Sequence, residues 1–343
     1  MSTTSTVKRH VFDVALRPVL GSTFQPTGFP DLGAATFDRP IRIGAELKTQ
    51  QCLIVESVQS MANRLEGTGW DDAAQAPVEL LNGLPYIEIR RAPATDESDY
   101  LTSSRTEAHR IFSAYVRDSD WDGRSGDAVL LEKIGVKAET PLDYRAVAAA
   151  VLAIDPFSLL HGVFFAGSSK GKVSRRANWP TQPRITRAIG AVIEAHDVAE
   201  VASGGRKSDL VRHSLSDETA SSLGGANEGY GSIPFHRVEY TAASIVASFV
   251  VDVELLRSYG LPAEATHLLE TLALWEIRTL VDGGLRLRTA CDLELVDTEI
   301  RDRRDNELPS LDTLTAQLRK AIPAAAASLG DGAPIVVHWS GKK

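Results

Sequence analysis

Two apolar periodicities alternate along the chain and predict a mixed fold. His10–Val19 and Tyr240–Val253 place an apolar side chain at every second position, the spacing of one face of a strand. Pro262–Val281 instead shows the spacing of a long helix, with Gly283 as its stop. The same reasoning predicts strands at Gly284–Leu295 and Pro334–Trp339, and helices at Gln51–Glu66, from Leu142 to Asp155, after Pro183 (with Ile185, Ile189 and Val192 inward) and from Ser310.

These elements favour one large α+β domain. Strands and helices do not alternate strictly, and several strands are amphipathic, which is typical of an antiparallel sheet rather than a doubly wound parallel one. The segment Gly21–Phe37 contains three glycines and two prolines and is expected to be irregular. No fixed-period repeat and no linker interrupts the chain, so residues 1–343 are expected to form a single elaborated domain.

Composition narrows the class of protein. With 343 residues, 43% hydrophobic and 24% charged, the chain is expected to be soluble and globular. It has no apolar segment long enough for a bilayer and no secretory signal, so we expect a cytoplasmic protein with no membrane partner. Two distant cysteines, Cys52 and Cys291, argue against a disulfide scaffold or a zinc site, and no cofactor is expected.

Positive charge is concentrated against an acidic background. The formal net charge is -8, yet the stretch from Pro156 to Ile193 contains no carboxylate. A local positive field of this kind typically attracts phosphate backbones, although a solvated surface loop is the alternative. The cations of this stretch are Lys170, Lys172, Arg175, Arg176, Arg184 and Arg187, and a second Gly-rich basic stretch adds Arg206, Lys207, Arg212 and His213.

Three further sets of polar residues are candidates for RNA contact. Gln59, Asn63 and Arg64 share the predicted helix, where short amides can contact a sugar or a base edge. Arg286 and Arg288 share a strand face, with cross-strand pairing to Asp292 or Glu294 as the alternative. Phe235 lies beside His236 and Arg237; this group suits stacking on single-stranded bases, or else a hairpin whose ring reaches the core.

Catalytic chemistry has little support. The run GSSKGKV departs from a phosphate-binding loop in its glycine spacing and in having Val173 where a metal-binding hydroxyl belongs. His161, His213 and His236 could act as acid or base in RNA cleavage, but a histidine in such a loop more often contacts phosphate or solvent. The acidic residues Asp118, Asp120, Asp122 and Asp127 lack the closing glutamate of a calcium loop and are expected to form a solvated acidic loop.

Five runs in order resemble one known family: Phe24–Phe37, Leu53–Glu66, Asp155–Ala166, Gly229–Ala242 and Gly284–Glu294. Together they are similar to the RAMP-superfamily backbone subunit of the type I-G (formerly I-U) CRISPR Cascade. The resemblance implies a modified RRM-like, ferredoxin-like palm with an antiparallel sheet and inserted finger and thumb elements. Residues 67–141 would be the finger-like insertion and the Gly-rich segment 203–238 the thumb-like one.

The resemblance also implies a function. Copies of such a subunit stack head to tail along a CRISPR RNA, grip its backbone and present it for pairing with target DNA, beside other Cascade subunits. The resemblance also implies which residues contact RNA, namely Gln59, Asn63, Arg64, His236, Arg237, Arg286 and Arg288. The expected function is therefore non-catalytic RNA binding. The alternatives are a metal-independent RNase of the same superfamily, which processes CRISPR RNA, and a scaffold that binds only protein.

Overall fold

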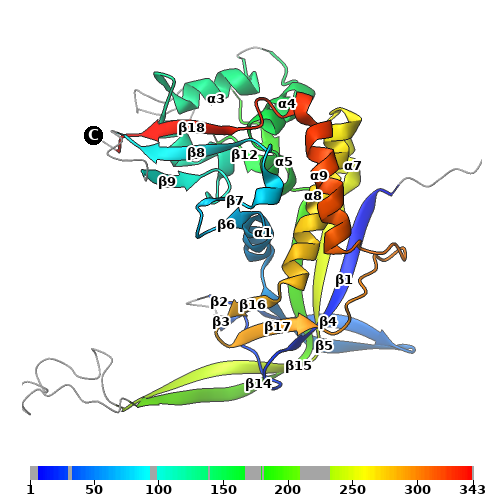
Figure 1. Cartoon of the computed structure of the whole chain (residues 1–343). Coiled ribbons are helices and arrows are strands. Elements are labelled where there is room, and N and C mark those ends of the chain that lie inside the picture. The colour runs from blue at the N-terminus through cyan, green and yellow to red at the C-terminus, as the bar shows by residue number, and fades with distance from the viewer. Residues whose placement is uncertain are drawn as a thin grey trace, which may run out of the picture.

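The computed structural model describes residues 7–29, 33–92, 99–137, 140–166, 179, 181–208 and 232–341. Its largest feature is a seven-stranded sheet, the main sheet, in which every neighbouring pair is antiparallel (Figure 1). This confirms the predicted α+β class with an antiparallel sheet. Across the sheet the strands are β16 (Leu285–Arg288), β17 (Cys291–Leu295), β1 (Arg9–Pro18), β15 (Ser232–Asp252), β14 (Ile189–Ser208), β5 (Glu46–Glu56) and β4 (Thr36–Ile43).

Helices cover one face of this sheet. The longest, α8 (Ala263–Asp282), packs on β15, and α1 (Val58–Gly67) packs on β14, while α9 (Leu311–Ala324) packs on α8. The other helices are α2 (Ala114–Asp118), α3 (Gly126–Ile134), α4 (Tyr144–Ile154), α5 (Phe157–His161) and α7 (Val253–Ser258), with the 3-10 turns η1 (Glu79–Leu81), η2 (Arg110–Phe112) and η3 (Ala326–Ser328).

The core forms where the predicted alternation meets the helices. Phe12 of β1 lies opposite Phe249 of β15, and both side chains are buried. Leu268 and Leu272 of α8 are fully buried as well. The structure confirms six predicted features. They are the strand at β1, the inward face of β15, the long helix α8, the helix at α4, the helix start at Ser310 and the closing strand.

The helix predicted at Gln51–Glu66 is wrong in its first half. Residues up to Glu56 form β5, and the helix begins only at Val58, because Ser57 caps it by accepting a hydrogen bond from the Ser60 amide. Leu53 and Val55 are both fully buried. A short apolar run of this kind fits a buried strand as well as a helix, so periodicity alone could not separate the two.

The helix predicted after Pro183 is also wrong. Residues 184–185 form β13 (Arg184–Ile185), paired with β12 (Val163–Phe164), and β14 begins at Ile189. Burial then alternates, with Ile189, Ala191 and Ile193 inward and Val192 half-buried on the other face. The main-sheet partners on both sides decide this conformation.

Two smaller corrections concern turns. The single strand predicted over Gly284–Leu295 is a hairpin of β16 and β17, which keeps Leu285, Cys291 and Leu293 buried on one face while Thr289 is exposed in the turn. The segment expected to be irregular around Gly21–Phe37 contains the small pair β2 (Gly28–Phe29) and β3 (Gly33–Ala34), and β4 begins inside it at Thr36.

A second sheet lies on the far side of the helices from the main sheet (Figure 1). The central strand β18 pairs in parallel with β8, so this sheet is mixed, which the expectation of antiparallel pairing did not include. Its strands in order are β11 (Arg124–Ser125), β10 (Asp120–Trp121), β18 (Pro334–Trp339), β8 (Tyr86–Arg91) and β9 (Tyr100–Ser103), and nearby lie the short strands β6 (Trp70–Asp71) and β7 (Ala76–Pro77).

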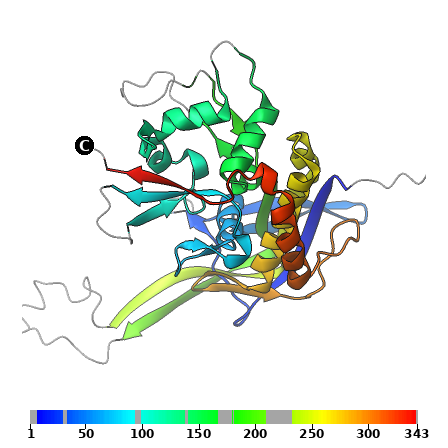
Figure 2. The ribbon, with the colours of Figure 1, turned by 45° about the horizontal axis from the view of Figure 1, so that its top comes forward.

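A long arm extends from the main sheet. Strands β14 and β15 stay paired from Ile189 with Val251 to Ser208 with Ser232, and their far halves project away from the body in both views (Figures 1 and 2). Within the described residues, no helix combines the length and apolar character needed to cross a membrane.

Candidate nucleic-acid interface

The predicted RNA contacts that the structure describes come from three neighbouring elements. They lie on α1, on the β16–β17 hairpin below it, and on the β14–β15 arm below that hairpin (Figure 1). Several predicted residues cannot be placed, because Lys170, Lys172, Arg175, Arg176, Arg212 and His213 lie outside the described residues. Arg206, Lys207 and Phe235 lie in the strands of the arm, where Arg206 is opposite Pro234 and Phe235 is opposite Gly205.

The exposed face of α1 carries a chain of amide groups. Gln59 Nε2 donates a hydrogen bond to Asn63 Oδ1 at 3.3 Å, and both residues are exposed, as the sequence predicts. Arg187, two residues before β14, joins them, since its Nη2 donates to Gln59 Oε1 at 3.0 Å. Arg187 was not among the residues selected from sequence for RNA contact. Its membership of the carboxylate-free stretch was the signal that could have selected it.

A buried carboxylate gathers two more predicted guanidinium groups. Glu56, at the end of β5, forms an ion pair with Arg288 and lies 3.7 Å from Arg64 Nε, and its side chain is 3% exposed. Arg64 Nη2 also donates to the Leu287 carbonyl, and Arg288 Nη1 to the Gln25 carbonyl, both at 2.8 Å. The two guanidinium groups therefore have fixed positions and share one negative charge, which leaves a net positive site.

Arg286 and Arg288 differ in their surroundings. The alternative interpretation, pairing with a carboxylate, is correct for Arg288, but the carboxylate is Glu56 rather than Asp292 or Glu294. Glu294 instead pairs with Arg17 at 2.8 Å. Arg286 is exposed and lies opposite Asp292 in the hairpin.

On the arm, an ion pair holds the side chain of Arg237 in place. Its guanidinium lies 2.7 Å from the Glu239 carboxylate, which also accepts a 2.7 Å hydrogen bond from the Thr23 hydroxyl. These contacts with Thr23 and Arg237 lower the pKa of Glu239, with the Thr23 hydrogen bond the larger cause. His236, which precedes Arg237 in β15, is exposed.

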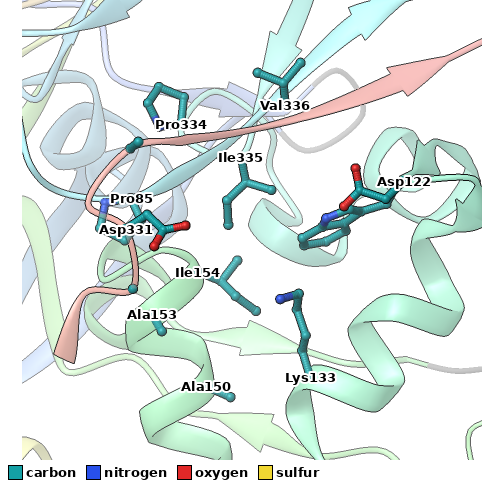
Figure 3. A pocket seen from close by; sticks show the side chains of 13 residues that line it. Pro85, Asp122, Lys133, Ala150, Ala153, Ile154, Asp331, Pro334, Ile335 and Val336 are labelled. Atoms are coloured by element: carbon teal, nitrogen blue, oxygen red, sulfur yellow. The ribbon is translucent and has the colours of Figure 1, made fainter. Parts of the chain in front are cut away.

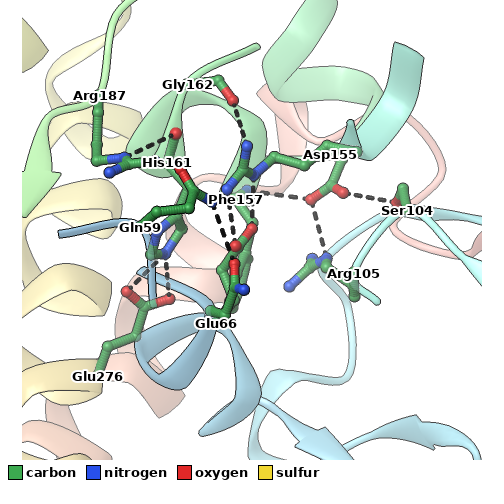
Figure 4. Close-up of polar contacts among 12 residues, drawn as sticks. Gln59, Glu66, Ser104, Arg105, Asp155, Phe157, His161, Gly162, Arg187 and Glu276 are labelled. Carbon is green, nitrogen blue, oxygen red and sulfur yellow. Dashed lines mark hydrogen bonds and ion pairs between the residues drawn. The ribbon is translucent and has the colours of Figure 1, made fainter. Parts of the chain in front are cut away.

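Beneath α1 lies a buried polar network, which Figure 4 shows from close by. Arg110 donates to both Glu66 carboxylate oxygens, at 2.6 and 2.7 Å, and to the Gly162 carbonyl at 2.9 Å. Arg105 lies 2.9 Å from Asp155, with its guanidinium 3.6 Å from the centre of the Phe157 ring. This network joins the C-terminal end of α1 to α5 and the loop after β9, so it fixes the helix that carries Gln59 and Asn63.

His161 belongs to this network and not to an exposed loop. Its Nε2 lies 3.0 Å from the Glu276 carboxylate, and both side chains are completely buried. Burial lowers the pKa of His161, assisted by the nearby Arg110, and burial raises the pKa of Glu276. The expectation that His161 contacts phosphate or solvent is therefore wrong, because no ligand can reach the ring.

Two other predictions about chemistry can be compared with the structure. Asp127 was expected in a solvated acidic loop, but it is buried and accepts a 2.8 Å hydrogen bond from Trp179 Nε1. Asp118, Asp120 and Asp122 are exposed, as expected. Cys52 and Cys291 are both buried, and burial raises the pKa of the Cys291 thiol to about 11, so it acts as a small core residue. Among the described residues, no cluster of His, Cys, Asp and Glu could hold a metal ion.

We consider two hollows on the surface formed by the described residues. The larger, of about 550 Å³, lies beside β18, between Trp121, Lys133, Asp331 and Ile335 (Figure 3). None of the predicted RNA contacts that the structure describes lines it. The smaller, of about 250 Å³, includes Asn63 and Trp70 in its wall and therefore adjoins the amide face of α1.

Comparisons with known proteins identify the family. A family model described as CRISPR-associated protein GSU0053 matches residues 11–200, more than half of the chain. No curated protein matches the sequence. A solved chain of a "CRISPR RNA-guided surveillance complex, pre-nicking" shares 12% identity, with 83% of this chain and 76% of that chain covered, at a TM-score of 0.32. A TM-score of this size does not establish a common fold.

Proposed function

The chain belongs to the family of CRISPR-associated protein GSU0053, and from this premise we propose that it is a non-catalytic RNA-binding backbone subunit of a Cascade complex. The family confirms the resemblance to a Cascade backbone subunit, whereas the type I-G assignment stays a prediction. In this proposal the chain binds CRISPR RNA, oligomerises along it beside other Cascade subunits, and presents it to target DNA.

One structural observation supports RNA binding above all. Amide groups of α1 and guanidinium groups from three separate parts of the chain lie on adjacent elements, namely Gln59 and Asn63 beside Arg187, and Arg64 beside Arg288. Fixed guanidinium forks suit phosphate oxygens, and exposed amides suit sugar hydroxyls and base edges. Such contacts position a strand without reading most of its sequence, which is what a carrier of arbitrary guides requires.

The parts of the fold take roles within this proposal. The main sheet with α1 and α8 would be the RRM-like palm, residues 67–141 the finger-like insertion, and residues 203–238 the thumb-like insertion, whose described residues belong to the arm. β8 and β9 of residues 67–141 share their sheet with β18 from the end of the chain, so a finger of this kind would be anchored by two distant segments. We propose one domain over residues 1–343 for the same reason.

The burial of His161 supports a non-catalytic role, because it removes one of the three candidate acid–base groups. His213 and His236 keep the RNase alternative open to experiment. Site-specific cleavage of precursor RNA by the purified protein in EDTA, lost in a His236→Ala or His213→Ala variant, would contradict the proposal.

The first prediction concerns Arg187. We expect Arg187→Ala to weaken binding of unrelated single-stranded RNAs alike, because the side chain would contact phosphate rather than bases. The slope of log affinity against log salt should become shallower by about 0.7, the effect of one lost phosphate contact on a single strand. Fluorescence anisotropy over a salt series measures both quantities.

Arg124→Ala is the matched control, since Arg124 is exposed, pairs with Glu132 at 2.5 Å and lies beside α3. It should leave affinity and slope unchanged. Equal slopes for Arg187→Ala and the unmodified protein would show that Arg187 does not touch phosphate. Failure of the unmodified protein to bind any RNA would contradict the proposed function itself.

A further inference from the structure

The larger hollow, here called the β18 hollow, lies where two strands of the second sheet separate. β18 pairs with β8 along its whole length but with β10 at only one position, His338 with Asp120. Within the described residues, the edge of β18 that faces away from β8 therefore has no strand partner from Pro334 to Val336, and these residues line the hollow. An unpaired strand edge is a place where a segment of a partner can be added.

Apolar side chains from three elements line the β18 hollow. Ile335 of β18 and Ile154 of α4 point into it (Figure 3), and Trp121 of β10 belongs to the same lining. The volume of about 550 Å³ lies in the range of pockets that hold a molecule of drug size, which is also the bulk of a few side chains. The hollow can therefore take the tip of a hairpin but not a folded domain.

The rim of the β18 hollow carries negative charge. Asp122 and Asp331 are exposed, lie on opposite sides of Ile335 in Figure 3, and form no salt bridge with another described residue. Lys133 is the cation of the lining and lies over the Trp121 ring, 5.5 Å from its centre. Two carboxylates repel the phosphates of RNA and attract a cationic partner, so the chemistry of the rim selects protein rather than RNA.

A hairpin tip with apolar side chains projects from another part of the same chain. β4 and β5 are paired as far as Ile43 and Glu46, and Gly44 makes the turn with a φ of +62°. Every residue of this tip, residues 40–49, is exposed except Ile41, which is half-buried. Ile43 and Leu47 are 54% and 67% exposed. Two large apolar side chains so exposed at one tip indicate a surface that a partner covers.

The free charge of the tip is opposite to that of the hollow. Arg42 lies directly across the hairpin from Leu47, is exposed, and has no ion-pair partner among the described residues, whereas Lys48 lies 3.6 Å from Glu46. The tip extends from the main sheet, and the β18 hollow belongs to the second sheet on the far side of the helices (Figure 1). One copy therefore presents the two complementary surfaces in different places.

We propose that the β18 hollow receives the β4–β5 tip of a neighbouring copy of this chain. Leu47 and Ile43 cover the apolar lining, and Arg42 meets the carboxylates of Asp122 and Asp331. The contact joins two different surfaces, so it is heterologous and can repeat from copy to copy in an open array. This inference rests on the proposed function, for which it names one of the contacts between copies.

A contact of this size is weak between free molecules. Copies bound next to each other on one RNA are held at a high effective concentration, which makes a weak contact between them effective. The docking therefore contributes to assembly on RNA and requires no preference for any base.

Charge reversal on RNAs of two lengths tests the docking. Arg42→Glu, or Asp122→Arg together with Asp331→Arg, should weaken binding to an RNA that holds several copies by about tenfold, the loss expected for one modest neighbour contact. Each variant should bind an RNA that holds one copy as the unmodified protein does. Combining the changes on both surfaces should restore most of the affinity. Arg304→Glu, the same change at an exposed position before α9, is the control.

Cross-linking locates the contact directly. The chain's own cysteines, Cys52 and Cys291, are buried, so introduced thiols would react first. A variant with Leu47→Cys and Ala333→Cys, both at exposed positions, should form a ladder of linked copies with a short bismaleimide on the long RNA. Leu20→Cys with Ala333→Cys is the matched control, because Leu20 is 88% exposed but lies outside the tip.

The outcomes separate this inference from the proposed function. Unchanged assembly of the charge-reversed variants, without a ladder, would overturn the docking and leave RNA binding by each copy intact. Assembly lost on reversal of either surface and not recovered in the combination, with melting temperatures unchanged, would overturn the pairing of these two surfaces. An unmodified protein that binds no RNA would overturn the proposed function. In that case a ladder in concentrated protein alone would still support the docking, and its absence would overturn the docking as well.

Discussion

The guanidinium groups at the proposed interface are held by protein oxygens before any ligand arrives. Arg64 and Arg288 each donate to a backbone carbonyl and share Glu56, while Arg237 is paired with Glu239. An arginine fork fixed in this way loses less side-chain freedom when it meets a phosphate than a free lysine does. The interface is therefore pre-organised by acceptors that come from distant parts of the chain.

A histidine away from the interface, His10, predicts that the stability of the fold depends on pH. His10 lies 3.1 Å from Glu270 and 3.3 Å from Asp302, and the hydrogen bond to Glu270 raises the pKa of His10, with Asp302 assisting against the effect of burial. The folded state thus binds the proton more tightly than the unfolded chain. The resulting stability is fully present below the unfolded pKa of 6.5 and is lost as pH rises through the higher folded value.

We therefore expect the difference in unfolding free energy between the unmodified protein and His10→Gln to shrink as pH rises above 6.5. Urea denaturation at a series of pH values measures this difference. His338→Gln, on an exposed position of β18, is the matched control for loss of a histidine side chain. A difference that stays constant from acidic to alkaline pH would refute the assignment of a charged His10.

At the scale of the element, α1 and α8 show how one helix serves the core and another serves the interface. α8 buries Leu268, Leu272 and Trp275 in the core, whereas α1 buries Met61, Ala62 and Leu65 and keeps its amides outside. The polar network under α1 then fixes the helix where apolar packing ends. Stability and ligand contact are thereby separated onto different residues.

This separation predicts unequal effects of two alanine substitutions. Leu272→Ala should lower the unfolding free energy by about 2–5 kcal/mol, because the side chain is fully buried and its removal leaves a cavity. Gln59→Ala removes an exposed amide and should change it by about 0.5 kcal/mol or less, while weakening RNA binding. Thermal or urea unfolding tests both, and a Gln59→Ala variant that unfolds while Leu272→Ala does not would reverse the assigned faces.

At the scale of the whole molecule, the proposed function requires two different self-contacting surfaces. Identical head-to-tail contacts build an open helical array rather than a closed dimer. The arm of β14 and β15 projects from one side of the body, so the described part of the chain is already asymmetric in the way such an array needs (Figures 1 and 2).

We expect the number of copies in a complex to increase with RNA length. The free protein should be monomeric or heterogeneous, since in this proposal the RNA aligns the copies. Light scattering with RNAs of several lengths measures the mass of each complex. A fixed number of copies at every length would exclude the filament arrangement, while a complex that forms equally well without RNA would exclude alignment by RNA.

The local pattern of residues was sufficient for much of the fold. Alternation identified β1 and the inward face of β15, helical spacing identified α8, and a serine cap located the start of α9. The order of five long runs was sufficient for the family, which residues 11–200 confirm. These features depend on neighbours within a few residues of one another, or on the order of motifs, and both can be read along a chain.

Only the tertiary structure decided the features that depend on distant partners. The apolar run before Glu56 is a strand because β4 and β14 pair with it, and β18 joins β8 in parallel across most of the chain. Arg288 meets Glu56, Arg187 meets Gln59, and His161 is buried against Glu276 rather than exposed. Each of these three side-chain contacts joins residues more than a hundred positions apart, so no local periodicity carries information about them, and the packing of the two sheets around the helices brings them together.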